Sequence, residues 1–368
     1  QLDKKLPQVY YNMGVCLNIL GKNIDAIDSF KKAISLKDNY LESYIQIGQL
    51  FKKMSLLDEA IKIYKLALPK VTQKDTINVN ISEVYYLQKN YQLSIKYAED
   101  ALNLNAKNYF AKINIANCLM DQGEIENGII ELEQAKVINS NSSMIFNNLG
   151  YGYKLLGNES EAIINYKKAI ELQPTFWEAY NNLSLVYEEK GDIQPAIKMC
   201  QKSINIEPKN PDAYNNLGVL YFKLKNYKRA LEKIQKAINL KSNFTVAYNN
   251  LGNVFQEMKD YTKALYYYEL ALKDNKESPV IQNNIAKVQN LIGNYNKSIH
   301  HRKLAVKLDP NSFVYLETLL FDLNYSPNMS AVEIFKYYKQ LDQRFGLPHK
   351  DKWKAFAQPK APKSKLKI

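Results

Sequence analysis

Residues 143–176 read SMIFNNLGYGYKLLGNESEAIINYKKAIELQPTF, and residues 177–210 read WEAYNNLSLVYEEKGDIQPAIKMCQKSINIEPKN. Both stretches have Asn-Asn-Leu near the start, Ala-Ile in the middle and a proline near the end. The same 34-residue spacing continues without insertion as far as Ser312, in nine blocks that start at Pro7, Leu41, Asp75, Tyr109, Ser143, Trp177, Pro211, Thr245 and Pro279. A fixed period of this length indicates repeated units that pack on their neighbours.

Small residues recur at three places in every block. Positions 8, 20 and 27 hold Gly, Ala or Ser throughout, and position 8 reads Gly14, Gly48, Ser82, Ala116, Gly150, Ser184, Gly218, Gly252 and Ala286. Two antiparallel helices approach to about 8–10 Å only where the facing side chains are small. Larger residues four apart, such as Leu149 and Tyr153, fill the space around them. A turn at 156–158 and a late proline, Pro174, end the two helices of that block, so each block is predicted to be a helical hairpin.

This pattern of small residues, aromatic fillers and late proline resembles the tetratricopeptide repeat family over 306 of the 368 residues. The resemblance implies an all-α fold, a right-handed superhelical solenoid of antiparallel helix hairpins. It also implies that the first helix of each hairpin lines a concave surface, where such proteins bind other proteins.

The composition argues against membrane and nucleic-acid functions. No apolar run approaches the roughly 18 residues that span a bilayer. The net charge is +13, but residues 346–368 hold seven lysines against one aspartate, so the repeats are only mildly basic. A basic segment near prolines is more often a solvated linker than a nucleic-acid site. We therefore expect neither a membrane nor a nucleic acid as a partner.

The cysteines and histidines do not suggest a metal site. The three cysteines lie far apart and lack the CxxC or Cys/His spacing of metal and redox sites, which favours a reducing, cytoplasmic location. Cys16 and Cys118 share position 10 and are expected to pack in the core. His300, His301 and His349 are expected on the surface.

A side-chain amide occupies position 6 of every block, namely Asn12, Gln46, Asn80, Asn114, Asn148, Asn182, Asn216, Asn250 and Asn284. In the last five blocks position 5 is also Asn. An amide offers both a donor and an acceptor, so a row of amides can hold an extended chain by its backbone, almost independently of sequence. The alternative is that these amides tie adjacent helices together. The unbroken row favours binding, and we predict that the eight asparagines bind an acceptor polypeptide.

No catalytic, cofactor or metal site is predicted. The clamp by which some repeats of this kind hold carboxylates needs basic residues at position 5, where this chain has apolar residues and asparagines. Gly150, Gly152 and Gly157 have the wrong spacing for a dinucleotide-binding loop and fall on an expected helix. No Ser, His and Asp cluster is suggested.

The repeat pattern stops after Ser312. Residues 313–346 predict a helix, a stop at Tyr325-Ser326-Pro327, and a second helix after Ser330, with Glu333 completing a capping box. We expect this segment to be a helical cap or connector. Its residues Leu323 to Phe345 resemble the connector of O-linked GlcNAc transferases and SPINDLY-type glycosyltransferases.

That resemblance implies that residues 1–6 are a truncated flank and that residues 347–368 are a basic linker entering a missing catalytic domain. Residues 364–368 resemble the first strand of that domain. The favoured function is then the acceptor-binding arm of a cytoplasmic protein O-glycosyltransferase that uses UDP-GlcNAc or GDP-fucose. The alternative is a stand-alone scaffold for assembling protein complexes. The partners expected are extended or unstructured protein segments, and a homodimer is kept as a further option.

Overall fold

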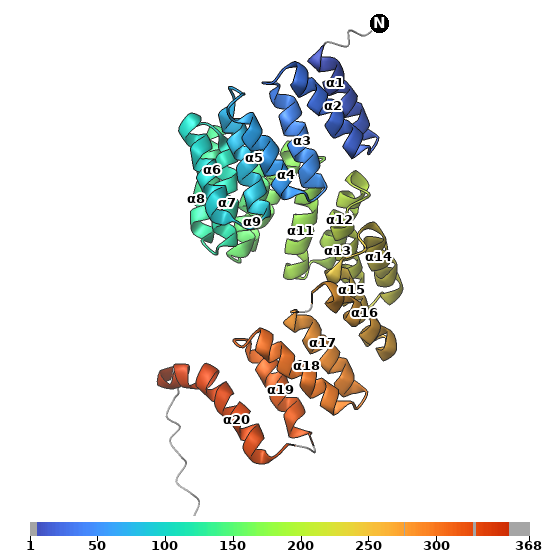
Figure 1. The fold of residues 1–368 in the computed structure, drawn as a ribbon. Helices are drawn as coiled ribbons and strands as arrows, with labels where there is room; N and C mark the ends of the chain where they lie inside the picture. The colour runs from blue at the N-terminus through green and yellow to red at the C-terminus, as the bar shows by residue number, and fades with distance from the viewer. Residues whose placement is uncertain (1–5, 276, 327–328, 353–368) are drawn as a thin grey trace, which may run out of the picture. The chain divides into compact units, whose positions relative to one another are not determined.

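In the computed structural model, residues 6–275, 277–326 and 329–352 are described (Figure 1). They form twenty α-helices and contain no strand, which confirms the predicted all-helical class. The chain divides into an N-terminal unit, residues 1–207, and a C-terminal unit, residues 208–368. The expected flank at residues 1–5 and the linker beyond residue 352 lie outside the described residues.

The N-terminal unit consists of six hairpins. Their first helices are α1 (Pro7–Ile19), α3 (Leu41–Lys53), α5 (Lys74–Leu87), α7 (Tyr109–Asp121), α9 (Ser143–Leu155) and α11 (Trp177–Lys190). Their second helices are α2 (Asn23–Leu36), α4 (Leu57–Ala67), α6 (Tyr91–Leu104), α8 (Ile125–Ile138), α10 (Glu159–Leu172) and α12 (Ile193–Ile206).

The C-terminal unit begins with three further hairpins. These are α13 (Pro211–Lys223) with α14 (Tyr227–Leu240), α15 (Thr245–Glu257) with α16 (Tyr261–Asp274), and α17 (Pro279–Leu291) with α18 (Tyr295–Leu308). The predicted block starts coincide with the first residue of a helix except in the third hairpin, where α5 begins one residue early at Lys74. The first helices of successive hairpins therefore begin 34 residues apart, apart from the one-residue shift at α5.

Each unit is a continuous stack. The two helices of a hairpin pack on each other, and each second helix also contacts the first helix of the next hairpin in the same unit. First helices contact the first helix of the following hairpin as well, for example α5 with α7 and α7 with α9. The first helices therefore form one layer of the stack, and side chains from successive hairpins come together on it.

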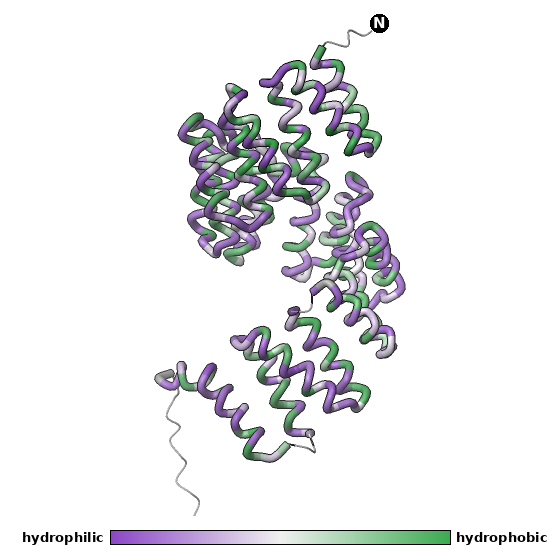
Figure 2. The backbone as a smooth tube through the Cα atoms, viewed as in Figure 1, coloured by the Kyte–Doolittle hydropathy of each residue, from purple (hydrophilic) through white to green (hydrophobic). Residues whose placement is uncertain are grey.

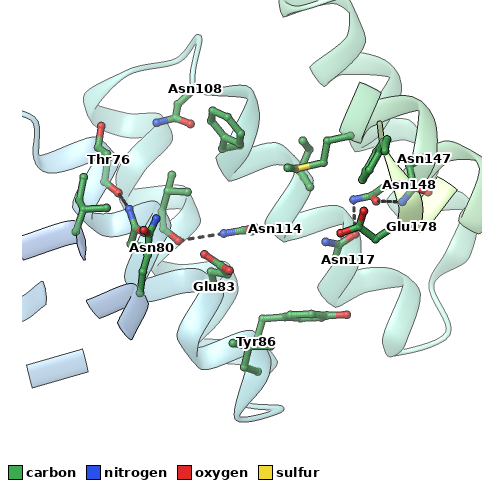
Figure 3. Close-up of a pocket in the computed structure, with 18 residues that line it drawn as sticks. Thr76, Asn80, Glu83, Tyr86, Asn108, Asn114, Asn117, Asn147, Asn148 and Glu178 are labelled. Carbon is green, nitrogen blue, oxygen red and sulfur yellow. Dashed lines mark hydrogen bonds between the residues drawn. The ribbon is translucent and has the colours of Figure 1, made fainter. Parts of the chain in front are cut away.

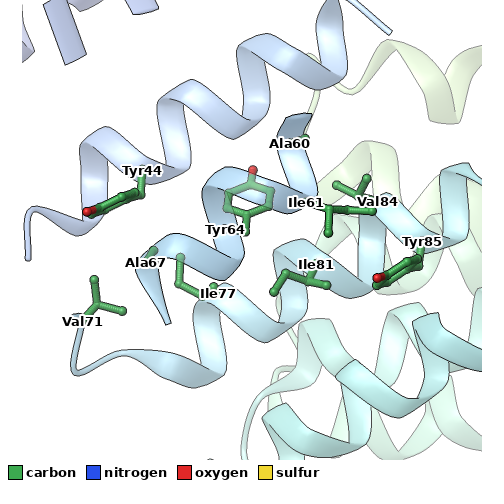
Figure 4. Close-up of a cluster of buried hydrophobic side chains, with 10 residues drawn as sticks. All are labelled: Tyr44, Ala60, Ile61, Tyr64, Ala67, Val71, Ile77, Ile81, Val84 and Tyr85. Atoms are coloured by element: carbon green, nitrogen blue, oxygen red, sulfur yellow. The ribbon is translucent and has the colours of Figure 1, made fainter. Parts of the chain in front are cut away.

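The apolar core is shared between hairpins, as Figure 4 shows for the second and third. Tyr44 of α3, Tyr64 of α4, and Ile77 and Ile81 of α5 belong to one cluster and have no solvent exposure. Because α5 belongs to the next hairpin, neither hairpin can bury this surface alone. Figure 2 shows hydrophobic and hydrophilic residues alternating along the helices, as amphipathic packing requires.

Position 8 is small because a large side chain of the second helix lies against it. A Cβ added to Gly48 would lie 2.1 Å from Cζ of Tyr64, and one added to Gly252 would lie 2.4 Å from Cε1 of Tyr268. Real carbon atoms do not approach so closely. In these two hairpins the close packing of helices that the sequence predicted is therefore made by glycine against an aromatic ring.

After the repeats come α19 (Phe313–Asn324), α20 (Ala331–Leu341), the π-helical turn Asp342–Gly346 and the 3₁₀ turn Leu347–Lys352. The predicted capping box is confirmed: the amide N–H of Glu333 donates to Ser330 Oγ, and the Ser330 N–H donates to Glu333 Oε2. Helix α20 packs on α19 but buries none of its own residues.

Two expectations about single residues are wrong. Cys118 is buried as expected, but Cys16 is exposed, because no helix among the described residues covers position 10 of α1. His301 is half-buried and its Nδ1 lies 2.7 Å from Gln282 Oε1 on α17. Burial and the neighbouring His300 and Lys297 lower the pKa of His301 below its usual value.

Candidate functional site

A groove of about 670 Å³ opens on the layer of first helices in the N-terminal unit. It is lined by 18 residues from α3, α5, α7, α9 and the start of α11, and Figure 3 shows their side chains. We call it the amide groove because six of these residues are asparagines. They are Asn108 at the N-cap of α7, and Asn80, Asn114, Asn117, Asn147 and Asn148 within helices.

The groove has a regular construction because the same repeat positions line it in successive hairpins. Position 2 contributes Thr76, Phe110, Met144 and Glu178; position 6 contributes Asn80, Asn114 and Asn148; position 9 contributes Gln49, Glu83 and Asn117. Residues at these spacings lie on one face of a helix. Each row therefore crosses the groove from helix to helix, one side chain per hairpin.

The eight asparagines predicted to bind a polypeptide are not equivalent. Asn80, Asn114 and Asn148 line the amide groove, whereas Asn182, Asn216, Asn250 and Asn284 are half-buried elsewhere on the first helices. Asn12 is exposed on α1, where its Oδ1 accepts a bond from Gln8. The binding role stays a prediction for all eight.

The alternative role, tying adjacent hairpins together, is confirmed in the N-terminal unit. Asn182 Nδ2 donates to Asn147 Oδ1 at 3.1 Å, Asn147 Nδ2 to Asn148 Oδ1 at 3.2 Å, and Asn148 Nδ2 to Asn117 Oδ1 at 3.1 Å. This relay of four amides runs from α11 through α9 to α7. Such chains polarise each member, which strengthens the donor at the end of the relay.

The C-terminal unit contains the same kind of bond. Asn250 Nδ2 donates to Asn215 Oδ1 at 2.9 Å, and Asn284 Nδ2 donates to Asn249 Oδ1 at 3.0 Å. Both pairs join position 6 of one hairpin to position 5 of the hairpin before it. The asparagines at position 5 thus supply acceptors for the asparagines at position 6.

Two neighbouring side-chain amides on α7, Asn114 and Asn117, each have a polar group left to form a hydrogen bond with a guest in the groove. Asn114 Nδ2 donates to Val79 O and to Ser82 Oγ, which uses both its N–H groups and leaves its carbonyl oxygen. Asn117 accepts the relay through Oδ1, and within the described residues its own N–H groups have no acceptor. Side by side on one helical face, they offer one acceptor and one donor, the complement of a peptide unit.

The charges of the groove differ from those of the whole chain. Its lining has two carboxylates, Glu83 and Glu178, and no lysine or arginine, although the chain holds 50 basic against 37 acidic residues. Lys52 Nζ lies 2.6 Å from Glu83 Oε2 and neutralises it. Burial raises the pKa of Glu178 above its usual value, and the nearby Glu207 acts in the same direction.

Sequence reasoning missed Asn117, Glu178 and the apolar pair Phe110 and Met144. The sequence could have indicated these residues, because positions 2 and 9 lie on the same helical face as the asparagines at position 6. These positions vary in chemistry from block to block, however, so a search for a repeated residue type passes over them. Across the described part of the chain, no cluster of three or more His, Cys, Asp or Glu could hold a metal ion.

No helix of the described residues has both the length and the apolar character needed to span a membrane. Comparison with protein families finds a tetratricopeptide repeat at residues 210–277 and again at 7–40, 41–68 and 76–108, and a TPR repeat at 151–191 and 189–225. Together these matches span more than half of the chain.

One curated relative is the BBSome complex member BBS4 of Bos taurus. It is 24% identical over 178 residues, which are 48% of this chain and 34% of the relative. The chain therefore spans about a third of the length of that relative.

Solved structures are similar in fold. The APC/C hetero-tetramer Cut9–Hcn1 superposes with a TM-score of 0.67 and 15% identity, covering 81% of this chain and 58% of that one. A monomeric mutant of IFIT1 with Gppp-AAAA gives a TM-score of 0.62 and 17% identity, covering 93% and 91%. At such identities the likeness shows only the fold. With the family matches and the nine observed hairpins, it establishes that this chain belongs to the tetratricopeptide repeat family.

Proposed function

We propose that this chain is a protein-binding scaffold whose amide groove holds an extended polypeptide segment. The observation that carries the proposal is the pair Asn114 and Asn117, which offers an acceptor and a donor in a groove lined by five first helices. An extended guest has unpaired backbone N–H and C=O groups, and such groups need partners when they leave water. The amide relay fixes Asn117 and so reduces the cost of ordering it on binding.

The chemistry of the lining supports a protein guest over a nucleic acid. Phosphate backbones are bound chiefly by lysine and arginine, and neither lines the amide groove. A phosphate there would face Glu83 and Glu178 instead. The name of the bovine relative, a member of the BBSome complex, is in keeping with a role in complex assembly. Two free, buried thiols, Cys118 and Cys200, are consistent with a cytoplasmic location.

A matched pair of double variants tests the proposal. Asn114→Ala with Asn117→Ala changes positions 6 and 9 of α7, and Asn250→Ala with Asn253→Ala changes the same positions of α15. Both variants lose bonds between hairpins, because Asn250 donates to Asn215 and Asn253 accepts from Asn284. Each lost bond should lower the free energy of unfolding by about 0.5–1.5 kcal/mol.

Only the α7 variant should lose affinity for unstructured peptides, by several-fold or more, as measured by fluorescence anisotropy with a labelled peptide library. The α15 variant should bind as the unaltered chain does. Equal affinities for both variants and the unaltered chain, with helicity preserved, would show that the amides act only within the stack. An equal loss of affinity in both variants would show that the guest contacts the position-6 asparagines along the whole chain and not only those of the amide groove.

As a second and more specific candidate, we propose that the scaffold is the acceptor-binding arm of a protein O-glycosyltransferase. It rests on the connector-like sequence from Leu323 to Phe345, which forms the end of α19, α20 and the π-helical turn. The bovine relative and the Cut9–Hcn1 structure carry the names of other complexes. Reading the coding sequence beyond Ile368 tests this candidate, since a further domain with alternating strand and helix patterns supports it and a stop codon there removes it.

A further inference from the structure

The amide groove has an unpaired negative charge at one end. Glu178 is half-buried in the first turn of α11, and none of the groups that shift its pKa is a cation in the described part of the chain. Figure 3 shows it at the same end of the groove as Asn147 and Asn148. A carboxylate that is partly withdrawn from water without a cation gains most from a partner that brings one.

Beside this charge the groove is apolar. Phe110 and Met144 precede Glu178 in the row of position-2 residues, and their side chains are 42% and 41% exposed. Large apolar side chains exposed together in a concave site are the usual anchors for a guest side chain. Methionine adapts to guests of different shape because its side chain is unbranched and polarisable.

The repeat sets the distance between these two features. Packed helices lie about 8–10 Å apart, so successive members of the position-2 row have about that spacing. An extended chain advances about 3.1–3.4 Å per residue. One hairpin therefore corresponds to about three residues of the guest.

We propose that the amide groove selects a segment with an apolar side chain, held by Phe110 and Met144, and a lysine or arginine about three residues away, paired with Glu178. This rests on the proposed function and adds the chemistry of the guest. The backbone is held by Asn114 and Asn117, and the charge of Glu178 supplies selectivity. Glu83 does not compete for the basic residue because it is paired with Lys52.

Three labelled peptides test the selectivity on the full chain, residues 1–368. All are rich in serine and proline and carry one phenylalanine; the first has a lysine about three residues after it, and the second has glutamine in place of lysine. In a third peptide the lysine precedes the phenylalanine, so that the same test also determines the direction in which the guest chain runs. Affinity is measured by fluorescence anisotropy at low and high salt.

The lysine peptide, in one of its two orders, should bind about five- to tenfold more tightly than the glutamine peptide, and the difference should shrink at high salt. Glu178→Gln should remove the difference. The matched control Glu171→Gln, which alters an exposed carboxylate of α10 that is paired with Lys168, should keep it.

The results separate the two proposals. Equal binding of the lysine and glutamine peptides to the unaltered chain overturns the selectivity while the groove's role in binding stands. A preference for lysine that survives Glu178→Gln also overturns it, because another group would then carry the charge. If none of the peptides binds, the proposed function fails together with its refinement.

Discussion

At the scale of single residues, position 15 of every hairpin adopts a left-handed backbone conformation. Five hairpins use glycine there, and four use other residues, namely Ser55, Lys89, Lys225 and Lys259, with φ between 56° and 62°. The left-handed region costs an L-residue with a side chain roughly 1–2 kcal/mol. These four turns therefore carry strain that the glycine turns do not.

Replacing Lys225 and Lys259 by glycine should stabilise the C-terminal unit by about 0.5–1 kcal/mol each, because relief of strain exceeds the entropy that glycine adds to the unfolded chain. Gly293→Lys is the reciprocal control: its added Cβ meets no atom within 4 Å, so any loss comes from the backbone. Urea unfolding followed by circular dichroism measures all three. Destabilisation by both glycine substitutions would contradict the argument.

Residue chemistry on the helix faces could be predicted, but its partners could not. The 34-residue period places Asn148 on the first helix and near its neighbours, because helical geometry fixes the face of each position. It does not determine the side-chain rotamer, nor which oxygen in the hairpin before it accepts the bond. That oxygen turns out to belong to Asn117, 31 residues away, whereas for Asn182 it belongs to Asn147, 35 residues away.

At the scale of helices, α19 continues the stack although the sequence pattern ends before it. Thr318 Oγ1 lies 3.3 Å from Asn283 Oδ1, 35 residues earlier, as in the bonds between asparagines of successive hairpins. The pattern was lost because Leu320 occupies the place that Gly, Ala or Ser fills in the repeats. A leucine there prevents close approach of a second helix, in keeping with α20, which buries no residue.

A buried ion pair joins α18 to α19. Arg302 and Asp322 are 7% and 0% exposed, and Arg302 Nε lies 3.1 Å from Asp322 Oδ2. Asn290 and Ser298 also donate to the aspartate, and Arg302 donates to Asn283 Oδ1. Both charged residues occupy repeat positions that are apolar in the other hairpins. The ion pair therefore couples α19 specifically to the hairpin of α17 and α18.

Asp322→Ala should destabilise the junction by about 3–5 kcal/mol, because it leaves the Arg302 guanidinium buried without its partner. The double variant Arg302→Met with Asp322→Leu should cost much less, since no charge then remains to be solvated. Hydrogen exchange of α18 and α19 measures the local stability. A double variant as unstable as the single one would show that the other polar contacts, not the ion pair, hold the helix.

At the scale of the whole molecule, the hairpins follow from the sequence and the groove does not. The 34-residue spacing recurs in the nine hairpins because each is a local structure closed by a short turn. The amide groove is assembled from five first helices whose residues lie between Ile45 and Glu178. Its width depends on how successive hairpins are stacked, which is set by many small packing contacts and is not encoded at any one position.

The same stacking predicts how stability varies along the chain. A solenoid is stabilised by contacts between neighbours, so units with one neighbour are weaker than units with two. Helix α1 buries only Gly14 and α20 buries nothing, whereas α7 buries six residues, including Ile113, Ile115 and Cys118. Local opening requires breaking those contacts, so the free energy of opening is higher for a helix that buries more residues.

Hydrogen exchange measured by mass spectrometry should therefore find α1 and α20 exchanging first and α7 last among the three. Because α7 carries Asn114 and Asn117, a peptide bound in the amide groove should slow exchange in α5, α7 and α9 further and leave α1 and α20 unchanged. Protection of α1 equal to that of α7 would mean that the stack opens as one cooperative unit, and the groove would then gain no rigidity from its central position.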